Sequence, residues 1–280
     1  MAKKASVYIA LGLIIIGLGI AFTGMSMKSF SFDSISSEPP YEEKTYDVTE
    51  DFDNIDLSVG SADIEILLSD DDDTHFICYE NANKTHDVTV EGDTLIIKEK
   101  QLKKLQIGFY FGNENKSKLY LPKNEYDEFI IKVGSGDLAF DSFSFASVNA
   151  EVGSGNVTIK NCDVSGDAVF DTGSGKVIIE NFTCDNGSFK TGSGDYELTN
   201  VICSGDLDLE VSSGDVEMDK CDADNMSISA SSGTIEGTVL SKFDYEITVS
   251  SGDTKVPDNG NDGTCKITVG SGDVRIELAK

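Results

Sequence analysis

The amino-acid sequence predicts an all-β protein of the β-solenoid, or β-helix-like, type, preceded by one transmembrane helix. Three observations lead to this prediction. A six-residue motif centred on Gly-Ser-Gly or Ser-Ser-Gly occurs eight times between residues 133 and 274. Apolar and polar residues alternate on both sides of each motif, as they do in half-buried strands. The first 24 residues differ from the rest of the chain, because two lysines are followed by an uncharged apolar run.

Residues 1–24 are expected to form a cytosolic tip and a membrane anchor. Lys3 and Lys4 precede the uncharged residues 5–24. A helix of that length, at about 1.5 Å per residue, covers a bilayer core of roughly 30 Å. Lysines on the amino side place the N-terminus in the cytoplasm and the C-terminal domain outside it. A cleaved signal peptide is the alternative, but the run is long for one and lacks an A-x-A site. We expect a retained single-pass anchor in the cell membrane.

The remaining chain divides into three parts by composition and pattern. Residues 25–44 are rich in Ser and contain Pro39, Pro40 and several acids, which is typical of a tether. Residues 45–126 alternate apolar and polar residues irregularly and are expected to form the first β part of the ectodomain. Residues 127–280 contain the regular repeat.

The repeat has a nearly constant length, measured at the second glycine of each motif. Successive second glycines are 19 or 20 residues apart. A fixed period of this size indicates a repeat architecture, in which coils stack about 4.8 Å apart and each unit is strand, corner, strand and second corner. A meander of hairpins is the alternative, but the constant period favours the solenoid. The eight glycines are Gly136, Gly155, Gly175, Gly194, Gly214, Gly233, Gly252 and Gly272.

The motif has the composition of a tight structural corner. Such a corner needs positive φ angles, which glycine adopts without a steric penalty. Ser and Asp side chains can satisfy backbone amides that have left the strand ladder. The second glycine is present in all eight motifs, whereas the first is replaced by Ser in three. We therefore expect the stricter structural requirement at the second position.

A column of aspartates follows the second glycine. It is interrupted by Asn156, Lys176 and Thr234. Calcium takes six to eight oxygen ligands, and one carboxylate per corner supplies few of them. Corner capping is therefore the better interpretation, and weak calcium binding is kept open as the sole cofactor hypothesis. The calcium candidates are Asp137, Asp195, Asp215, Asp253 and Asp273.

Six cysteines are present, and four of them fall in consecutive coils. Stacking would bring Cys184 and Cys203 about 5 Å apart, which is within reach of a disulfide. A disulfide is chemically permitted outside the cytoplasm. Buried free thiols explain the pattern equally well. No Cys-x-x-Cys pair occurs in the sequence, which gives little support for zinc.

Composition and motifs argue against several functional classes. Acidic residues number 50 and basic residues 22, and the net charge of −28 would repel nucleic acid. The two histidines, His75 and His86, lie in the irregular part. The chain contains no H-E-x-x-H, G-x-S-x-G or P-loop motif. We therefore predict no catalytic residues and no enzymatic activity.

The order of these elements resembles a known family. The sequence F-x-x-I-x-L-x-V-G-S-A-D-I occupies residues 52–64, and D-T-L-I-I (residues 93–97), L-x-L-P (residues 119–122) and the serial repeats follow. This order is similar to that of the bacterial putative-adhesin, β-strand-repeat domain family of unknown function, over residues 45–280. The resemblance implies a β-helix-like fold in the cell envelope, and it brings no catalytic residues.

These observations predict a non-catalytic, membrane-anchored, extracytoplasmic protein that acts as an adhesin or interaction scaffold. Its partner would be an envelope protein or a wall polymer. One alternative is an envelope-stress sensing or regulatory module that acts with a membrane partner. A second is a calcium-dependent structural surface protein. The strand at residues 274–278 lies close to the end of the chain, so end-to-end self-association is a further hypothesis.

Overall fold

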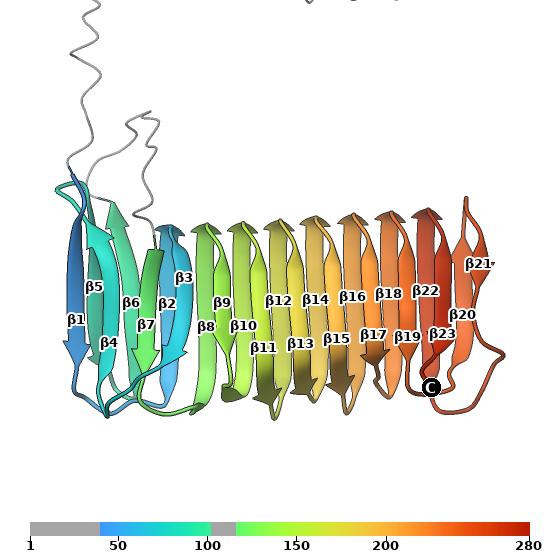
Figure 1. Cartoon of the computed structure of the whole chain (residues 1–280), viewed down its shortest axis with the longest axis horizontal. Helices are drawn as coiled ribbons and strands as arrows, with labels where there is room; N and C mark the ends of the chain where they lie inside the picture. The colour runs from blue at the N-terminus through green and yellow to red at the C-terminus, as the bar shows by residue number, and fades with distance from the viewer. Residues whose placement is uncertain (1–39, 102–115) are drawn as a thin grey trace, which may run out of the picture. The chain divides into compact units, whose positions relative to one another are not determined.

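The computed structural model describes residues 40–101 and 116–280 (Figure 1). Residues 41–101 and 116–280 belong to one compact unit. The predicted anchor, residues 1–24, and most of the predicted tether lie outside the described residues. Residues 40–101 and 116–280 contain no helix that is long and apolar enough to cross a membrane. The described residues are all-β, and their parallel strands wind into the expected solenoid.

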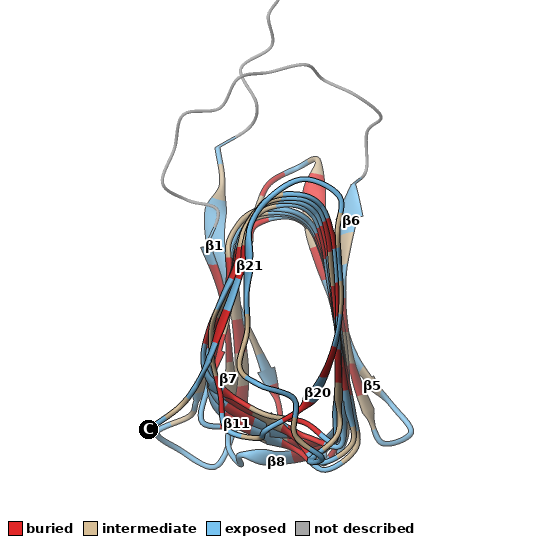
Figure 2. Cartoon of the chain, turned by 90° about the vertical axis from the view of Figure 1, so that its right-hand side faces the viewer, coloured by how far each residue is buried: buried red, intermediate tan, exposed pale blue. Residues whose placement is uncertain are grey.

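Each coil contributes one strand to each of two facing rows (Figures 1 and 2). Strands within a row are parallel and in register, so Val157 lies beside Val177 and Val177 beside Tyr196. In spatial order the first row is β2 (Asn54–Ser61), β8 (Glu125–Ser135), β10 (Ser144–Ser154), β12 (Asp167–Ser174), β14 (Asn186–Ser193), β16 (Asp206–Ser213), β18 (Asn225–Ser232), β22 (Thr264–Ser271) and β20 (Asp244–Val249).

The strands of the second row follow one another along the stack in the same order of coils as those of the first row. Alternate side chains of both rows point into the space between them, where they form the core. In spatial order it is β3 (Asp63–Leu68), β9 (Leu138–Asp141), β11 (Val157–Val164), β13 (Val177–Cys184), β15 (Tyr196–Cys203), β17 (Val216–Cys221), β19 (Ile235–Val239), β23 (Val274–Leu278) and β21 (Thr254–Lys255).

Like residues stack on like residues inside the solenoid. Phe170 and Phe189 lie on neighbouring coils with ring centroids 5.1 Å apart, and Phe182 contacts Phe170 from the facing row at 5.8 Å. One coil has no apolar partner of its own, so its inward residues are buried only when the next coil stacks on it. Burial of apolar surface contributes about 25 cal/mol per Å² to stability, and this contribution arises only when coils stack on one another.

Antiparallel strands close the amino-terminal end of the described unit. β6 (Thr94–Gln101) and β7 (Lys116–Leu121) form a coil outside β2 and β3. β5 (Lys84–Glu91) pairs antiparallel with β6, and β4 (Thr74–Glu80) pairs antiparallel with β7. β1 (Glu42–Val48) then covers the free edge of β4. We call β1, β4, β5, β6 and β7 the cap.

The coils at the other end do not stack in sequence order. β22 lies between β18 and β20, and β23 lies between β19 and β21. The strand near the end of the chain, residues 274–278, is β23, and it pairs along its whole length with β19. β21 pairs with Val274 and Arg275 on the other edge of β23, so β23 is not the last strand of its row, and end-to-end association stays a prediction. The outermost strand of the first row is β20. Its inner residues Ile247 and Val249 are half-buried.

Candidate functional site

The structure places the eight motif glycines where the chain passes from the first row to the second. Seven have φ between 128° and 149°, and Gly194 is the exception. The coils also approach closely at this corner. A Cβ on Gly155 would lie 2.0 Å from the carbonyl oxygen of Gly136, and one on Gly194 would lie 1.9 Å from that of Gly175. Both the backbone angle and the close approach favour glycine here.

The aspartates after these glycines form a hydrogen-bonded column along the stack. The amide of Asn156 donates to Asp137 at 2.7 Å, and the amide of Thr234 donates to Asp215 at 2.6 Å. The amide of Asp215 in turn donates to Asp195 at 2.9 Å, and that of Asp253 to Asp273 at 2.9 Å. Each of these four carboxylates therefore caps a backbone amide of the neighbouring coil, which is the structural role that favours Asp at a corner.

A second polar ladder lies at the opposite end of the coils, where the sequence analysis expected only a corner. Asn161, Asn181 and Asn200 adopt φ of 51° to 53°, in the left-handed region. The side-chain amide of Asn181 donates to Asn161 at 2.9 Å, and that of Asn200 donates to Asn181 at 3.1 Å. Asn is among the few residues that tolerate this backbone conformation. The recurrence of Asn at the repeat period is the feature of the sequence that could have predicted this ladder.

The six cysteines are all buried and free. Cys184 and Cys203 are in direct register on β13 and β15, with their sulfur atoms 3.0 Å apart. The two cysteines therefore lie next to each other, as the stacking predicts, and both are free thiols. The hydrogen bond from Cys184 and burial raise the pKa of the Cys203 thiol well above its usual range.

The outward side chains of both rows carry ion pairs between neighbouring coils. Lys160 lies 3.0 Å from Glu180, and Lys132 lies 3.4 Å from Glu151. Such exposed pairs contribute little stability individually. Because acids far outnumber bases in the chain, pairing the lysines leaves an acidic outer surface.

A shallow acidic groove of about 490 Å³ lies on the outer face of β15, β17, β19 and β23. Gly237 occupies the inward position that Met218 and Ile276 fill in the neighbouring strands, and the β17–β19 register shifts between Met218 and Cys221. A Cβ on Gly237 would lie 2.0 Å from the carbonyl oxygen of Met218. The lining acids are Glu197, Glu217, Asp219, Glu236 and Glu277, and Arg275 is the basic lining residue.

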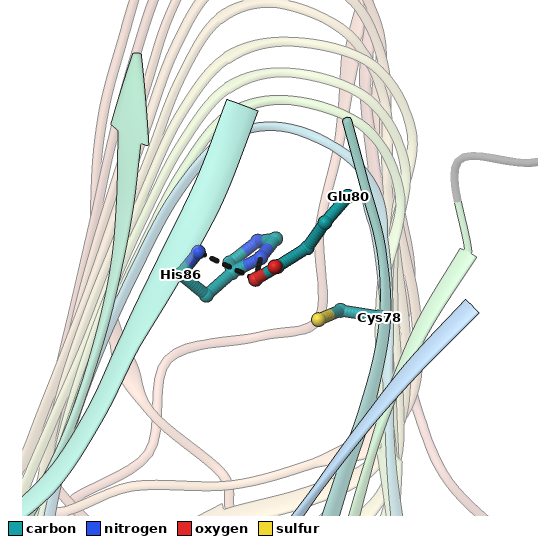
Figure 3. A group of neighbouring side chains, drawn as sticks. All are labelled: Cys78, Glu80 and His86. Carbon is teal, nitrogen blue, oxygen red and sulfur yellow. Dashed lines mark hydrogen bonds and ion pairs between the residues drawn. The ribbon is translucent and has the colours of Figure 1, made fainter. Parts of the chain in front are cut away.

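A polar cluster of Cys78, Glu80 and His86 lies inside the cap (Figure 3). Cys78 and Glu80 occupy alternate positions of β4, and His86 lies on β5 beyond the turn at Asn81–Lys84. The ligand atoms of the three side chains lie within 4.8 Å of one another. No motif in the sequence indicates this cluster.

Glu80 is the hydrogen-bonding centre of the cluster. Its Oε1 lies 3.1 Å from Nδ1 of His86 and accepts the His86 backbone amide at 2.6 Å. The Tyr46 hydroxyl of β1 donates to the same oxygen at 2.7 Å. Burial lowers the pKa of His86 and raises the pKa of the Cys78 thiol to about 12. The imidazole is therefore neutral and the thiol protonated at neutral pH.

Comparisons with known proteins agree with this architecture. The chain is similar to a Bacteroides fragilis structure described as a putative adhesin, with 14% identity, a TM-score of 0.55, and coverage of 86% of this chain and 100% of that one. A putative adhesin from Parabacteroides distasonis gives 16% identity, a TM-score of 0.51, and coverage of 85% and 98%. At these identities the likeness concerns the fold. Among curated proteins, none matches the sequence.

A family model supplies the remaining comparison. It is described as Toastrack DUF4097, and it matches residues 52–257, which include the cap strands β4 to β7 and most of the stacked coils. The match thus extends over more than half of the chain. The chain therefore belongs to the Toastrack DUF4097 family.

Proposed function

We propose that this protein is a non-catalytic scaffold of the cell envelope, anchored by residues 1–24, that binds a partner through its acidic outer surface. The observation that carries the proposal is the groove over β15, β17, β19 and β23. It is open, it is lined by five acids and one arginine, and rigid strands hold these side chains in fixed rows. The name given to the two similar structures, putative adhesin, is consistent with a binding role.

The chemistry of the partner follows from the charge of the groove. Carboxylates at Glu217, Asp219 and Glu236 attract a partner that presents lysine or arginine side chains. A basic face of another envelope protein fits this requirement. An anionic wall polymer would be repelled by the same charges.

In-cell crosslinking followed by mass spectrometry tests the proposal. We expect a specific partner with the wild-type protein, and at least about tenfold lower recovery with the Glu217→Lys/Glu236→Lys variant, because the groove then repels basic groups. Asp208→Lys/Glu246→Lys is the matched control, since it makes the same charge change on exposed positions of the first row. Recovery of no specific partner, or equal losses in both variants, would contradict the proposal.

Exposure of the stacked coils outside the cell is tested separately. Protease added to intact cells should remove the described domain and leave the amino-terminal anchor with the membrane fraction. Protection of the domain until the cells are lysed would show that the proposed orientation is wrong.

A further inference from the structure

We propose that Cys78, Glu80 and His86 form a zinc site inside the cap. This inference does not depend on the proposed function. The three side chains supply a sulfur, a carboxylate oxygen and an imidazole nitrogen, all within 4.8 Å of one another (Figure 3). This combination of ligand types is suited to Zn²⁺, whereas calcium and magnesium prefer oxygen ligands alone.

The spacing of the ligand atoms is close to what a tetrahedral zinc ion requires. Zn–N bonds of about 2.0 Å and Zn–S bonds of about 2.3 Å place neighbouring ligand atoms about 3.3–3.7 Å apart. Nδ1 of His86 and Oε1 of Glu80 are already 3.1 Å apart. Closing the remaining separations needs side-chain adjustments of about 1 Å. A solvent molecule would complete the coordination, as in zinc sites with three protein ligands.

The burial of the cluster supports a site rather than a surface ion pair. Cys78 is fully buried, and the His86 side chain is 1% exposed. Nδ1 of His86 faces Glu80 and is therefore the imidazole atom that would bind zinc, giving up its hydrogen bond to the carboxylate.

The surrounding charges leave the cluster able to accept a cation. Lys84 is one of the lysines that act on the Cys78 thiol, but its Nζ lies 3.1 Å from Glu99 and 3.0 Å from the carbonyl oxygen of Ser61. Glu99 therefore offsets the positive charge of Lys84. Tyr46 holds Glu80 in place from β1, which orients the carboxylate toward His86. Zinc would connect β4 and β5, the two strands that close the two rows.

Zinc binds the thiolate, so the metal must displace the proton of the buried Cys78 thiol when it binds. We therefore expect a proton to be released into the buffer on zinc binding.

Titration of the reduced, metal-free, full-length protein with zinc sulfate tests the proposal. Calorimetry should give one equivalent per chain, and cobalt(II) should give the thiolate charge-transfer band of a tetrahedral site. Cys78→Ala should lower the affinity at least about 100-fold, since even outer-shell changes at metal sites lower it by 10–100-fold. Cys265→Ala is the matched control, because Cys265 is equally buried but lies on β22. The control should bind zinc as the wild type does.

Two further variants decide the remaining outcomes. Glu80→Gln keeps the shape of the side chain, so it tests the site even if Cys78→Ala does not fold, and it should weaken binding at least about tenfold. Cys184→Ala removes one of the two thiols that lie together on β13 and β15. Zinc binding that disappears with Cys184→Ala but persists with Glu80→Gln would overturn the proposal, as would the absence of stoichiometric binding by the wild type.

Discussion

At the scale of single residues, the left-handed asparagines determine how sharply the coils turn. Asn181 has φ of 52° and exchanges side-chain hydrogen bonds with Asn161 and Asn200. Asn181→Ala should lower the free energy of unfolding by about 2 kcal/mol, because it loses both bonds and strains the backbone. Asn181→Gly loses the bonds but keeps the backbone angle, so it should be less destabilising by about 1 kcal/mol. Urea denaturation measures both; equal losses would show that backbone strain is unimportant at this corner.

The two histidines should influence stability in opposite directions with pH. Hydrogen bonding to Asp47 raises the pKa of His75 above 6.5, so its contribution is present below pH 6.5 and is lost as the pH rises through the folded-state value. Burial lowers the pKa of His86, so its contribution is present above pH 6.5 and is lost as the pH falls.

Thermal melts of the metal-free protein between pH 5 and 8 check this prediction. The difference in Tm between the wild type and His75→Gln should be largest at the acidic end. The difference between the wild type and His86→Gln should be largest at the alkaline end. Parallel curves for both variants would contradict the assignment.

At the scale of elements, the first and second glycine positions of the motif differ in how strictly they require glycine. Gly155 combines φ of 143° with a Cβ position 2.0 Å from a carbonyl oxygen, so Gly155→Ala should destabilise the protein by about 3 kcal/mol or more. Gly153→Ser is the control in the same coil, because Ser212, Ser231 and Ser250 occupy this position elsewhere. A Cβ on Gly153 would lie 2.5 Å from the carbonyl oxygen of Gly134, but Gly153 does not have a positive φ, so Gly153→Ser should cost less than Gly155→Ala, by about 1 kcal/mol or more. Similar losses in denaturant unfolding would show that the second glycine is not special.

The in-register strands β13 and β15 should also permit a disulfide. Parallel partners lie about 4.8 Å apart, within the Cα separation that a disulfide spans. After oxidation, unfolding and alkylation without reductant, we expect four labelled cysteines rather than the six of the reduced protein. Cys184→Ala should abolish this difference. Full labelling of six cysteines after oxidation would mean that the packed thiols resist bonding.

The strands and the stack were predictable from the sequence, whereas the cap cluster was not. The alternation around each motif predicts inward residues such as Val157, and the 19- or 20-residue period predicts stacking. Cys78 and Glu80 are two residues apart, so the sequence predicts that their side chains lie on the same face of a strand. Their contact with His86 depends on β4 and β5 closing opposite rows, and no periodic signal in the irregular part predicts that arrangement.

At the scale of the whole described unit, the order of coils was also beyond the sequence. β20 and β22 are both followed by the repeated motif, and both carry inward apolar residues, such as Tyr245 and Cys265. Either strand could therefore stack on β18. Contacts between the linkers favour the observed order, since the Lys242 amide donates to Asp262 and the Gly260 amide donates to Phe243. Such contacts between linkers leave no periodic pattern in the sequence, so the order of the coils could not be predicted from it.

The inserted coil predicts that the last strands of the chain are not the least stable. β22 hydrogen-bonds on both edges, to β18 and to β20, whereas β20 pairs on one edge among the described strands. Native-state hydrogen exchange should therefore protect the amides of β22 about as well as those of β16, and those of β20 less. Deleting residues 264–280 should lower Tm by several degrees or more, because β18 would lose one of its two partners and β20 would lose its partner among the described strands. Sequential stacking would instead make β22 the terminal strand. Faster exchange in β22 than in β20 would therefore refute the observed order, because a strand bonded on both edges cannot open more readily than its neighbour at the end of the stack.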